Sequence, residues 1–100
     1  MNKYEWKKIK NPQEMASEGG IALIAEEYDG TLICLERCDR YDAITCGGGW
    51  VHTMFVNPDH SMDTYEAMKK DLADFTDRVD DMSSEERSDY LRDFTHRYWE

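Results

Sequence analysis

The clearest pattern of apolar and polar positions runs from Met62 to Met82. Apolar residues recur there at spacings of three and four, and they are Tyr65, Met68, Leu72, Phe75, Val79 and Met82. This spacing is typical of the buried stripe of an amphipathic helix, which we predict over residues 63–81. At about 100° per residue, the side opposite the stripe carries Asp63, Asp74, Asp77 and Asp81, interrupted by Lys70. The exposed side of this helix is therefore predicted to be a row of short carboxylates.

A second helix is predicted directly after the first. The sequence Ser83-Ser84-Glu85-Glu86 indicates a capping box, with Ser83 as the N-cap. A helix over roughly residues 84–98 would then carry Tyr90, Leu91, Phe94 and Tyr98 on one face. Because the connector has only two or three residues, we expect an antiparallel helical hairpin. The seam between helices and sheet is expected to consist of Leu72, Phe75, Val79, Leu91 and Phe94.

Two β-hairpins are predicted before the helices. Residues 21–28 and 31–38 are apolar, β-prone runs separated by Asp29-Gly30, a strong signal for a two-residue turn. In that register Ala25 lies opposite Cys34 and Ile24 opposite Leu35. A second pair of strands, residues 41–46 and 50–56, is expected around three successive glycines, and Asn57-Pro58-Asp59 ends it.

The first twenty residues predict less regular structure. Residues 4–9 alternate weakly and indicate an edge strand, and residues 12–18 indicate a short helix that stops at Gly19-Gly20. The whole pattern predicts one domain, residues 1–100, of the α+β class. Its sheet has four or five antiparallel strands in two hairpins, and a C-terminal helical hairpin packs on it.

The amino-acid composition predicts a small hydrophobic core and a large negative net charge. Leu, Ile, Val and Phe total 16 of 100 residues, which alone would indicate disorder, but 12 aromatic residues and 6 Met supply bulky core material. The formal net charge is −10. Such a body should repel nucleic acid and membranes and attract basic proteins. With no apolar leader, no membrane span and three cysteines, an odd number, we expect a reduced, cytoplasmic protein.

The residue types of metal and catalytic sites are present without the matching spacing. Cys34, Cys38, Cys46, His52 and His60 are candidate zinc ligands. On a strand, however, the Cα atoms of Cys34 and Cys38 would lie about 13 Å apart, too far for one tetrahedral ion. The glycine run lacks the Lys-Ser/Thr of a phosphate loop, and the acidic pairs lack the calcium-loop pattern. We therefore expect no catalytic residues, no metal and no cofactor.

The carboxylate row is the candidate functional feature. Aspartate is a poorer helix former than glutamate, and several of these residues are like-charge neighbours three or four positions apart, which is also destabilising. Short carboxylates in a row can imitate the phosphates of a nucleic acid strand. A salt-loving host would produce the same enrichment in Asp. Exposed aromatic residues anchor many interfaces, so the predicted partner-binding residues are Asp63, Glu66, Asp74, Asp77, Asp81, Tyr28, Tyr41 and Trp99.

These features favour a small, non-enzymatic, acidic protein that occupies the basic nucleic-acid-binding surface of a nuclease or effector. By size and charge it is analogous to phage inhibitors of host defence nucleases, of the anti-CRISPR or anti-restriction kind, and to nuclease immunity proteins. The alternative is an adaptor or regulatory domain that binds through an aromatic patch around Tyr41 and Trp50, with acidity serving solubility. A small metal-dependent or thiol enzyme is the third class.

The cysteine spacing yields a first prediction: the domain folds without metal. Thermal melts with and without a strong chelator should superimpose, because no ion would be removed. A large fall in melting temperature on chelation would instead establish a structural metal site.

Overall fold

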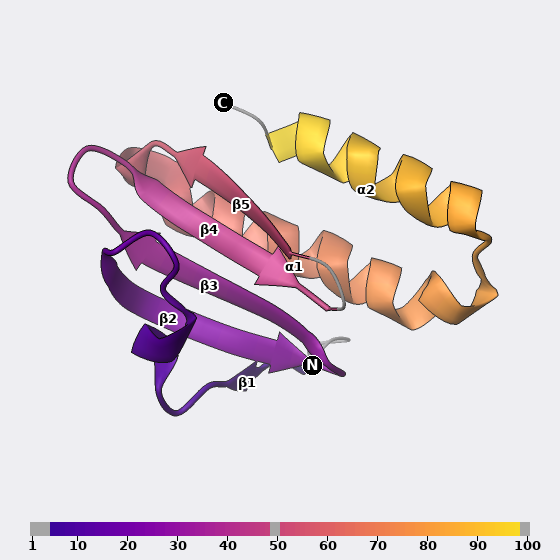
Figure 1. Cartoon of the computed structure of the whole chain (residues 1–100), viewed down its shortest axis with the longest axis horizontal. Coiled ribbons are helices and arrows are strands. Elements are labelled where there is room, and N and C mark those ends of the chain that lie inside the picture. The colour runs from indigo at the N-terminus through magenta and orange to yellow at the C-terminus, as the bar shows by residue number, and fades with distance from the viewer. Residues whose placement is uncertain (1–4, 49–50, 99–100) are drawn as a thin grey trace.

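The computed structural model describes residues 5–48 and 51–98, which form an antiparallel sheet with one helix behind it and a second helix beside its last strand (Figure 1). The sheet has five strands in the order β1-β2-β3-β4-β5. The strands are β1 (Lys7–Lys8), β2 (Ile21–Tyr28), β3 (Thr31–Arg37), β4 (Asp42–Gly47) and β5 (Val51–Val56). The helices are α1 (Ser61–Arg78) and α2 (Ser84–Tyr98), with 3₁₀ helices at Pro12–Met15, Pro58–His60 and Val79–Asp81. The predicted α+β fold is confirmed.

The first hairpin forms as its turn residues predict. Asp29 and Gly30 have φ angles of 46° and 88°, the left-handed conformation that a two-residue hairpin turn requires. Ala25 pairs with Cys34 and Ile24 with Leu35, in the predicted register. The second hairpin also forms, although Gly49 and Trp50 in its turn lie outside the described residues.

One face of the sheet packs on the helices and forms the core. Strand residues Ile33, Leu35, Ile44, Cys46, Met54 and Val56 contact helix residues Tyr65, Met68, Leu72 and Phe94. Alternate residues of each strand point to this face, as the period of a β-strand requires. Phe75 is also buried and packs on the Tyr90 ring at 5.0 Å between centroids. Val79 and Leu91 are only half-buried at the margin of the predicted seam.

The first helix ends earlier than predicted. The α-helix stops at Arg78, Val79–Asp81 form a 3₁₀ turn, and Met82 is extended. Carboxylates at the last turn oppose the helix dipole, and 3₁₀ turns commonly close helix ends. Asp81 is therefore exposed on the 3₁₀ turn that follows α1, whereas the sequence predicted it on the α-helix itself.

The capping box forms as predicted, whereas the N-terminal elements are shorter than expected. The Glu86 N–H donates to Ser83 Oγ at 3.1 Å, and the Ser83 N–H donates to Glu86 Oε1 at 3.2 Å. The expected helix over residues 12–18 is a single 3₁₀ turn, and the edge strand over residues 4–9 contains two paired residues. Neither helix in the described part of the chain is long and apolar enough to cross a membrane.

A buried carboxylate holds the N-terminal segment over the other face of the sheet. Glu36 accepts hydrogen bonds from the N–H groups of Ser17 at 3.1 Å, Glu18 at 3.2 Å and Gly20 at 2.5 Å. A Cβ at position 20 would lie 2.4 Å from the Arg37 carbonyl oxygen, so this approach requires glycine. We call this set of contacts the Glu36 clasp. Buried residues on this face include Ala25, Cys34 and Ala43, and β5 keeps exposed side chains.

Two phenylalanines with opposite burial provide a test of the core. Phe94 is 1% exposed and Phe55 is 50% exposed. Phe94→Ala should lower the free energy of unfolding by about 3–4 kcal/mol, because it removes a buried ring and leaves a cavity. Phe55→Ala should cost no more than about 1 kcal/mol, because half of that ring already contacts water. Urea denaturation of both variants checks this, and equal losses would contradict the assigned core.

Candidate protein-binding surfaces

The structure divides the predicted partner-binding residues among different places. Tyr28, Asp74, Asp77 and Asp81 lie at one end of the molecule, where the β2–β3 turn meets the C-terminal end of α1 (Figure 1). Tyr28 Oη donates a 2.6 Å hydrogen bond to Asp77 Oδ1, which joins these two elements directly.

The other predicted residues lie elsewhere. Asp63 and Glu66 are near the start of α1, and at 1.5 Å per residue Asp63 is about 21 Å along the helix from Asp77. Tyr41 follows β3 at the opposite end of the sheet from Tyr28. Trp99 is outside the described residues. The eight predicted residues therefore do not form one site.

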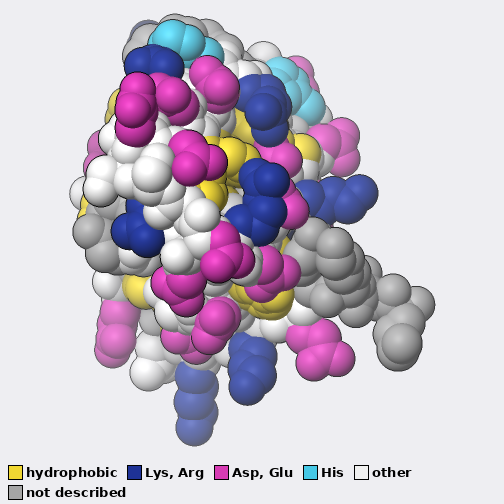
Figure 2. All heavy atoms as spheres, turned by 90° about the vertical axis from the view of Figure 1, so that its right-hand side faces the viewer, with side chains coloured by type: hydrophobic (Ala, Val, Ile, Leu, Met, Phe, Trp, Pro, Cys, Tyr) yellow, Lys and Arg dark blue, Asp and Glu magenta, His cyan; other side chains and the backbone are white. Residues whose placement is uncertain are grey.

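The end that carries Tyr28 and Asp77 contains an apolar pocket with a polar rim. We call it the hairpin-end face, and it comprises the β2–β3 turn, residues 74–81 and the start of α2. Its pocket has a volume of about 430 Å³ and is lined by Asp29, Gly30, Thr31, Gly48, Phe75, Thr76, Val79, Arg87 and Leu91. Figure 2 views the molecule from this end and shows hydrophobic side chains in a hollow surrounded by acidic and basic ones.

Internal hydrogen bonds fix the walls of this pocket. The hydroxyls of Thr31 and Thr76 are 2.7 Å apart, and Thr76 Oγ1 also donates to the Leu72 carbonyl at 2.7 Å. Arg87 Nε donates to the Val79 carbonyl at 3.0 Å, so its guanidinium is held at the wall. The pocket is therefore preformed between the hairpin and the two helices.

Several carboxylates of α1 are paired within the chain. Asp74 lies 3.3 Å from Arg78, and Glu66 lies 3.4 Å from Lys69. Asp71, on the same helix, accepts from Arg97 at 2.6 Å and from the Tyr98 hydroxyl. Within the described residues, no ion pair involves the exposed Asp77, Asp80 or Asp81. The hairpin-end face thus carries acidic side chains without an ion-pair partner among the described residues.

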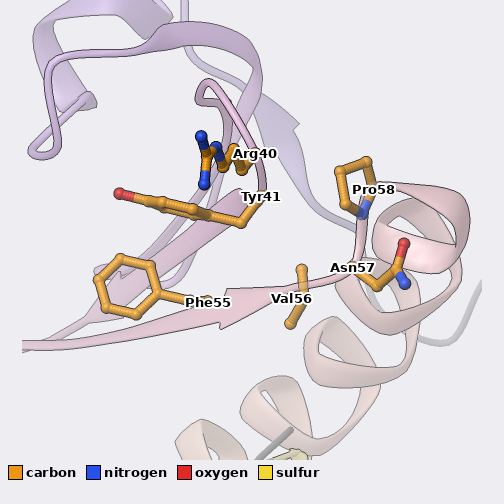
Figure 3. Close-up of a pocket in the computed structure, with 6 residues that line it drawn as sticks. All are labelled: Arg40, Tyr41, Phe55, Val56, Asn57 and Pro58. Atoms are coloured by element: carbon orange, nitrogen blue, oxygen red, sulfur yellow. The ribbon is translucent and has the colours of Figure 1, made fainter.

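An exposed aromatic pair lies at the other end. The Tyr41 and Phe55 rings meet edge to face, with centroids 4.9 Å apart, and they are 37% and 50% exposed. Figure 3 shows both rings beside a pocket of about 470 Å³ that Arg40, Val56, Asn57 and Pro58 also line. We call this the Tyr41–Phe55 patch. The sequence indicated Tyr41 but paired it with Trp50, which is outside the described residues.

The sequence did not identify Phe55 as a candidate binding residue. Residues 50–56 were predicted to form a strand, but the face of the sheet to which each side chain points was not assigned. The signal was the alternation of Val51, Thr53 and Phe55 along β5. Ala43 lies directly opposite Phe55 on the neighbouring strand. Tyr41 precedes Ala43 by two residues, so the Phe55 ring contacts the Tyr41 ring diagonally across the two strands. Aromatic rings span such diagonal separations readily.

The burial of Cys34 and Cys46 makes them poor candidates for thiol chemistry. No group of three or more His, Cys, Asp or Glu side chains within residues 5–48 and 51–98 is placed to hold a metal ion. Burial raises the pKa of Cys34 to about 11, with Glu36 adding to the effect, and burial raises the pKa of Cys46 to about 12. Thiols with such pKa values stay protonated near neutral pH and are poor nucleophiles.

A third polar cluster, around Tyr65, ties α1 to β2. Tyr65 Oη donates to Glu26 Oε1 at 2.8 Å, and Lys69 Nζ lies 3.0 Å from the same oxygen. Burial, followed by the hydrogen bond to Glu26, raises the Tyr65 pKa far above its usual value. The phenol therefore remains protonated and acts as a buried donor between two elements.

Comparisons with protein-family models, curated proteins and solved structures give no match. The function must therefore be inferred from the two surfaces themselves. One is acidic around an apolar pocket, and the other is aromatic beside an edge strand.

The half-buried His52 in β5 yields a prediction about pH. Its Nε2 atom is buried without a hydrogen-bond partner among the described residues, and desolvation lowers its pKa from the usual 6.5. The unfolded chain therefore binds a proton first as the pH falls below 6.5, and folding stability should decrease from there towards the lower pKa of the folded state. Urea unfolding at pH 7.5 and 5.5 should show this loss.

His52→Gln should reduce the loss of stability between these two pH values. The matched control is His96→Gln, since His96 is exposed on α2. An unchanged pH dependence in His52→Gln would show that other groups cause it. The pKa of Asp42 in the folded protein is lowered from 3.8, so this carboxylate becomes protonated only at a pH below 3.8. It does not titrate between pH 7.5 and 5.5.

Proposed function

We propose that this chain is a small acidic inhibitor that binds a basic nucleic-acid-binding protein and occupies the surface meant for nucleic acid. The observation that carries the proposal is the hairpin-end face, where acidic side chains and the guanidinium of Arg87 border a preformed apolar pocket. The net charge of −10 adds a long-range attraction to any basic surface.

The two components of this face have different roles in binding. The apolar floor of Phe75, Val79 and Leu91 would accept one partner side chain away from water, and such desolvated centres carry most of the binding energy in interfaces. The surrounding carboxylates would contact Lys and Arg side chains. Tyr28 holds Asp77 in one orientation, so less side-chain entropy is lost on binding.

Inhibition follows from the chemistry of the partner surface. A nuclease or effector binds nucleic acid through Lys and Arg side chains on its surface, and an acidic protein that pairs with them excludes the nucleic acid. This profile fits a phage-type inhibitor of a host defence nuclease, anti-CRISPR or anti-restriction in kind, or a nuclease immunity protein. Because Asp71 and Asp74 pair with Arg97 and Arg78, the imitation of phosphates would depend mainly on Asp77, Asp80 and Asp81, which form no ion pair within the described residues.

A second candidate function is an adaptor domain that binds an ordinary protein partner through the Tyr41–Phe55 patch. The exposure of both rings favours it, because aromatic residues are enriched at binding hot spots. The two candidates predict different contact residues at opposite ends of the molecule. Substitutions at one end therefore discriminate between them.

The triple variant Asp74→Asn, Asp77→Asn and Asp81→Asn tests the proposal. Its fold should be as stable as the parent, since Asn still accepts from Tyr28 and the exposed Asp74–Arg78 pair contributes little. In a pull-down from host lysate, the parent should capture a basic nucleic-acid-binding protein. The triple variant should bind it about thirtyfold more weakly or worse, because the charge pairs lost are worth about 2 kcal/mol or more.

A charge-matched control separates local contacts from net charge. The exposed Glu5, Glu14 and Asp93 lie outside the hairpin-end face and the Tyr41–Phe55 patch, and changing them to Gln, Gln and Asn alters the net charge equally. This control should keep most of the affinity, and an oligonucleotide that binds the captured protein should compete with the parent. Binding that resists added salt and survives the hairpin-end triple variant would refute the inhibitor proposal and favour the adaptor.

A further inference from the structure

The edge of the sheet at β5 lacks the charged residues, the proline and the bulge that protect many edge strands. β5 is last in the strand order, and no described strand pairs with its outer side. Its six residues, Val51–Val56, include no charged residue and no proline. Natural edge strands are usually shortened, bulged, or carry Lys or Pro to prevent further pairing. The opposite edge, β1, has only two residues.

Exposed apolar side chains of β5 lie next to this edge and form an apolar surface beside it. Val51 is 81% exposed and Phe55 is 50% exposed, and both point to the face of the sheet away from the helices. The Glu36 clasp holds the N-terminal segment over β2 and β3, where residues such as Ala25 and Cys34 are buried. A strand added to β5 would place alternate side chains next to Val51, Thr53 and Phe55.

We propose that β5 binds an extended segment of a partner protein by strand addition, and that this segment alternates apolar side chains with Lys or Arg. Backbone hydrogen bonds along the edge would supply affinity, and the apolar positions would pack on Val51 and the Tyr41–Phe55 patch. The basic positions follow from charge complementarity to a chain of net charge −10. This part of the inference rests on the proposed function, whereas the strand pairing does not.

Local charges agree with a basic occupant. Exposed carboxylates of Glu18, Asp39 and Asp59 lie near the Tyr41 end of β5, beside the guanidinium of Arg40 and that of Arg37, which pairs with Asp42 at 2.7 Å. Desolvation is the main cause of the raised pKa of Tyr41, and the nearby Glu18 carboxylate adds to it. A second copy of this chain is a poorer occupant, because edge-to-edge pairing would bring together two bodies that each carry −10.

A labelled peptide tests the inference directly. The probe is a fluorescein-labelled peptide of about nine residues that alternates Lys with Val, and its affinity is measured by fluorescence anisotropy. Val51→Thr with Phe55→Thr should weaken binding about tenfold or more, because these changes remove apolar contacts while keeping charge and strand propensity. The matched control, Ile21→Thr with Leu23→Thr, changes two exposed β2 residues and should stay within about threefold of the parent.

Modified peptides test the backbone and charge contributions. The same peptide with methyl groups on alternate backbone amides keeps its charge but cannot form the ladder, so it should bind about tenfold more weakly or worse. Hydrogen exchange of the β5 amides should slow in the complex with the unmodified peptide. Equal affinity for the methylated peptide, or for one with Gln in place of Lys, would overturn the inference.

Three further measurements distinguish a failure of this inference from a failure of the proposed function. The Asp74, Asp77 and Asp81 triple variant should bind the peptide within about threefold of the parent, because those residues lie away from β5. If β5 substitutions leave peptide binding unchanged, strand addition is wrong whatever the lysate experiment shows. If light scattering shows a dimer that Val51→Thr with Phe55→Thr dissociates, the edge belongs to a second copy and the inference is overturned.

Discussion

Burial of one stripe of α1 against the sheet decides where every candidate surface lies. Tyr65, Met68 and Leu72 are fully buried, so the helix can take only one rotation about its axis. Its 18 residues then span the sheet, with Asp63 at one end and Asp77 near the other. The stripe thus places one acidic end beside the β2–β3 turn. It also fixes where α2 begins, and hence the walls of the pocket between them.

Carboxylates join the elements of this protein at several junctions. Glu26 joins β2 to Tyr65 and Lys69 of α1, and Asp42 accepts from Arg37 and from Ser61 at the start of α1. Glu36 forms its clasp, and Asp71 connects α1 to Arg97 of α2. A chain with few aliphatic residues thus uses hydrogen-bonded acids where others use apolar contacts. Removing one partner of such a buried group is costly, so part of the acidic composition serves the fold.

Local patterns in the sequence predicted the elements, whereas long-range pairings stayed hidden. The Asp29-Gly30 turn, the Ser83–Glu86 capping box and the α1 stripe each depend on residues within a few positions of one another. The Glu36 clasp joins residues 16 or more positions apart, and Asp71 meets Arg97 across 26. Nothing in the spacing of single residues indicates such pairs. For the same reason, the sequence showed the row of acidic residues. It did not show that acids of α1 such as Asp71 form ion pairs with distant residues of the chain.

The two proposed surfaces are joined by β5 itself. Val51 pairs with Gly47, next to Gly48 of the hairpin-end pocket, whereas Phe55 and Tyr41 lie at the other end of the strand. Six residues of strand span about 20 Å. A partner segment added along β5 would therefore lead from the aromatic patch towards the acidic face. One partner that engages both surfaces would gain from the high effective concentration of the second contact, so two individually weak surfaces can give one tight complex.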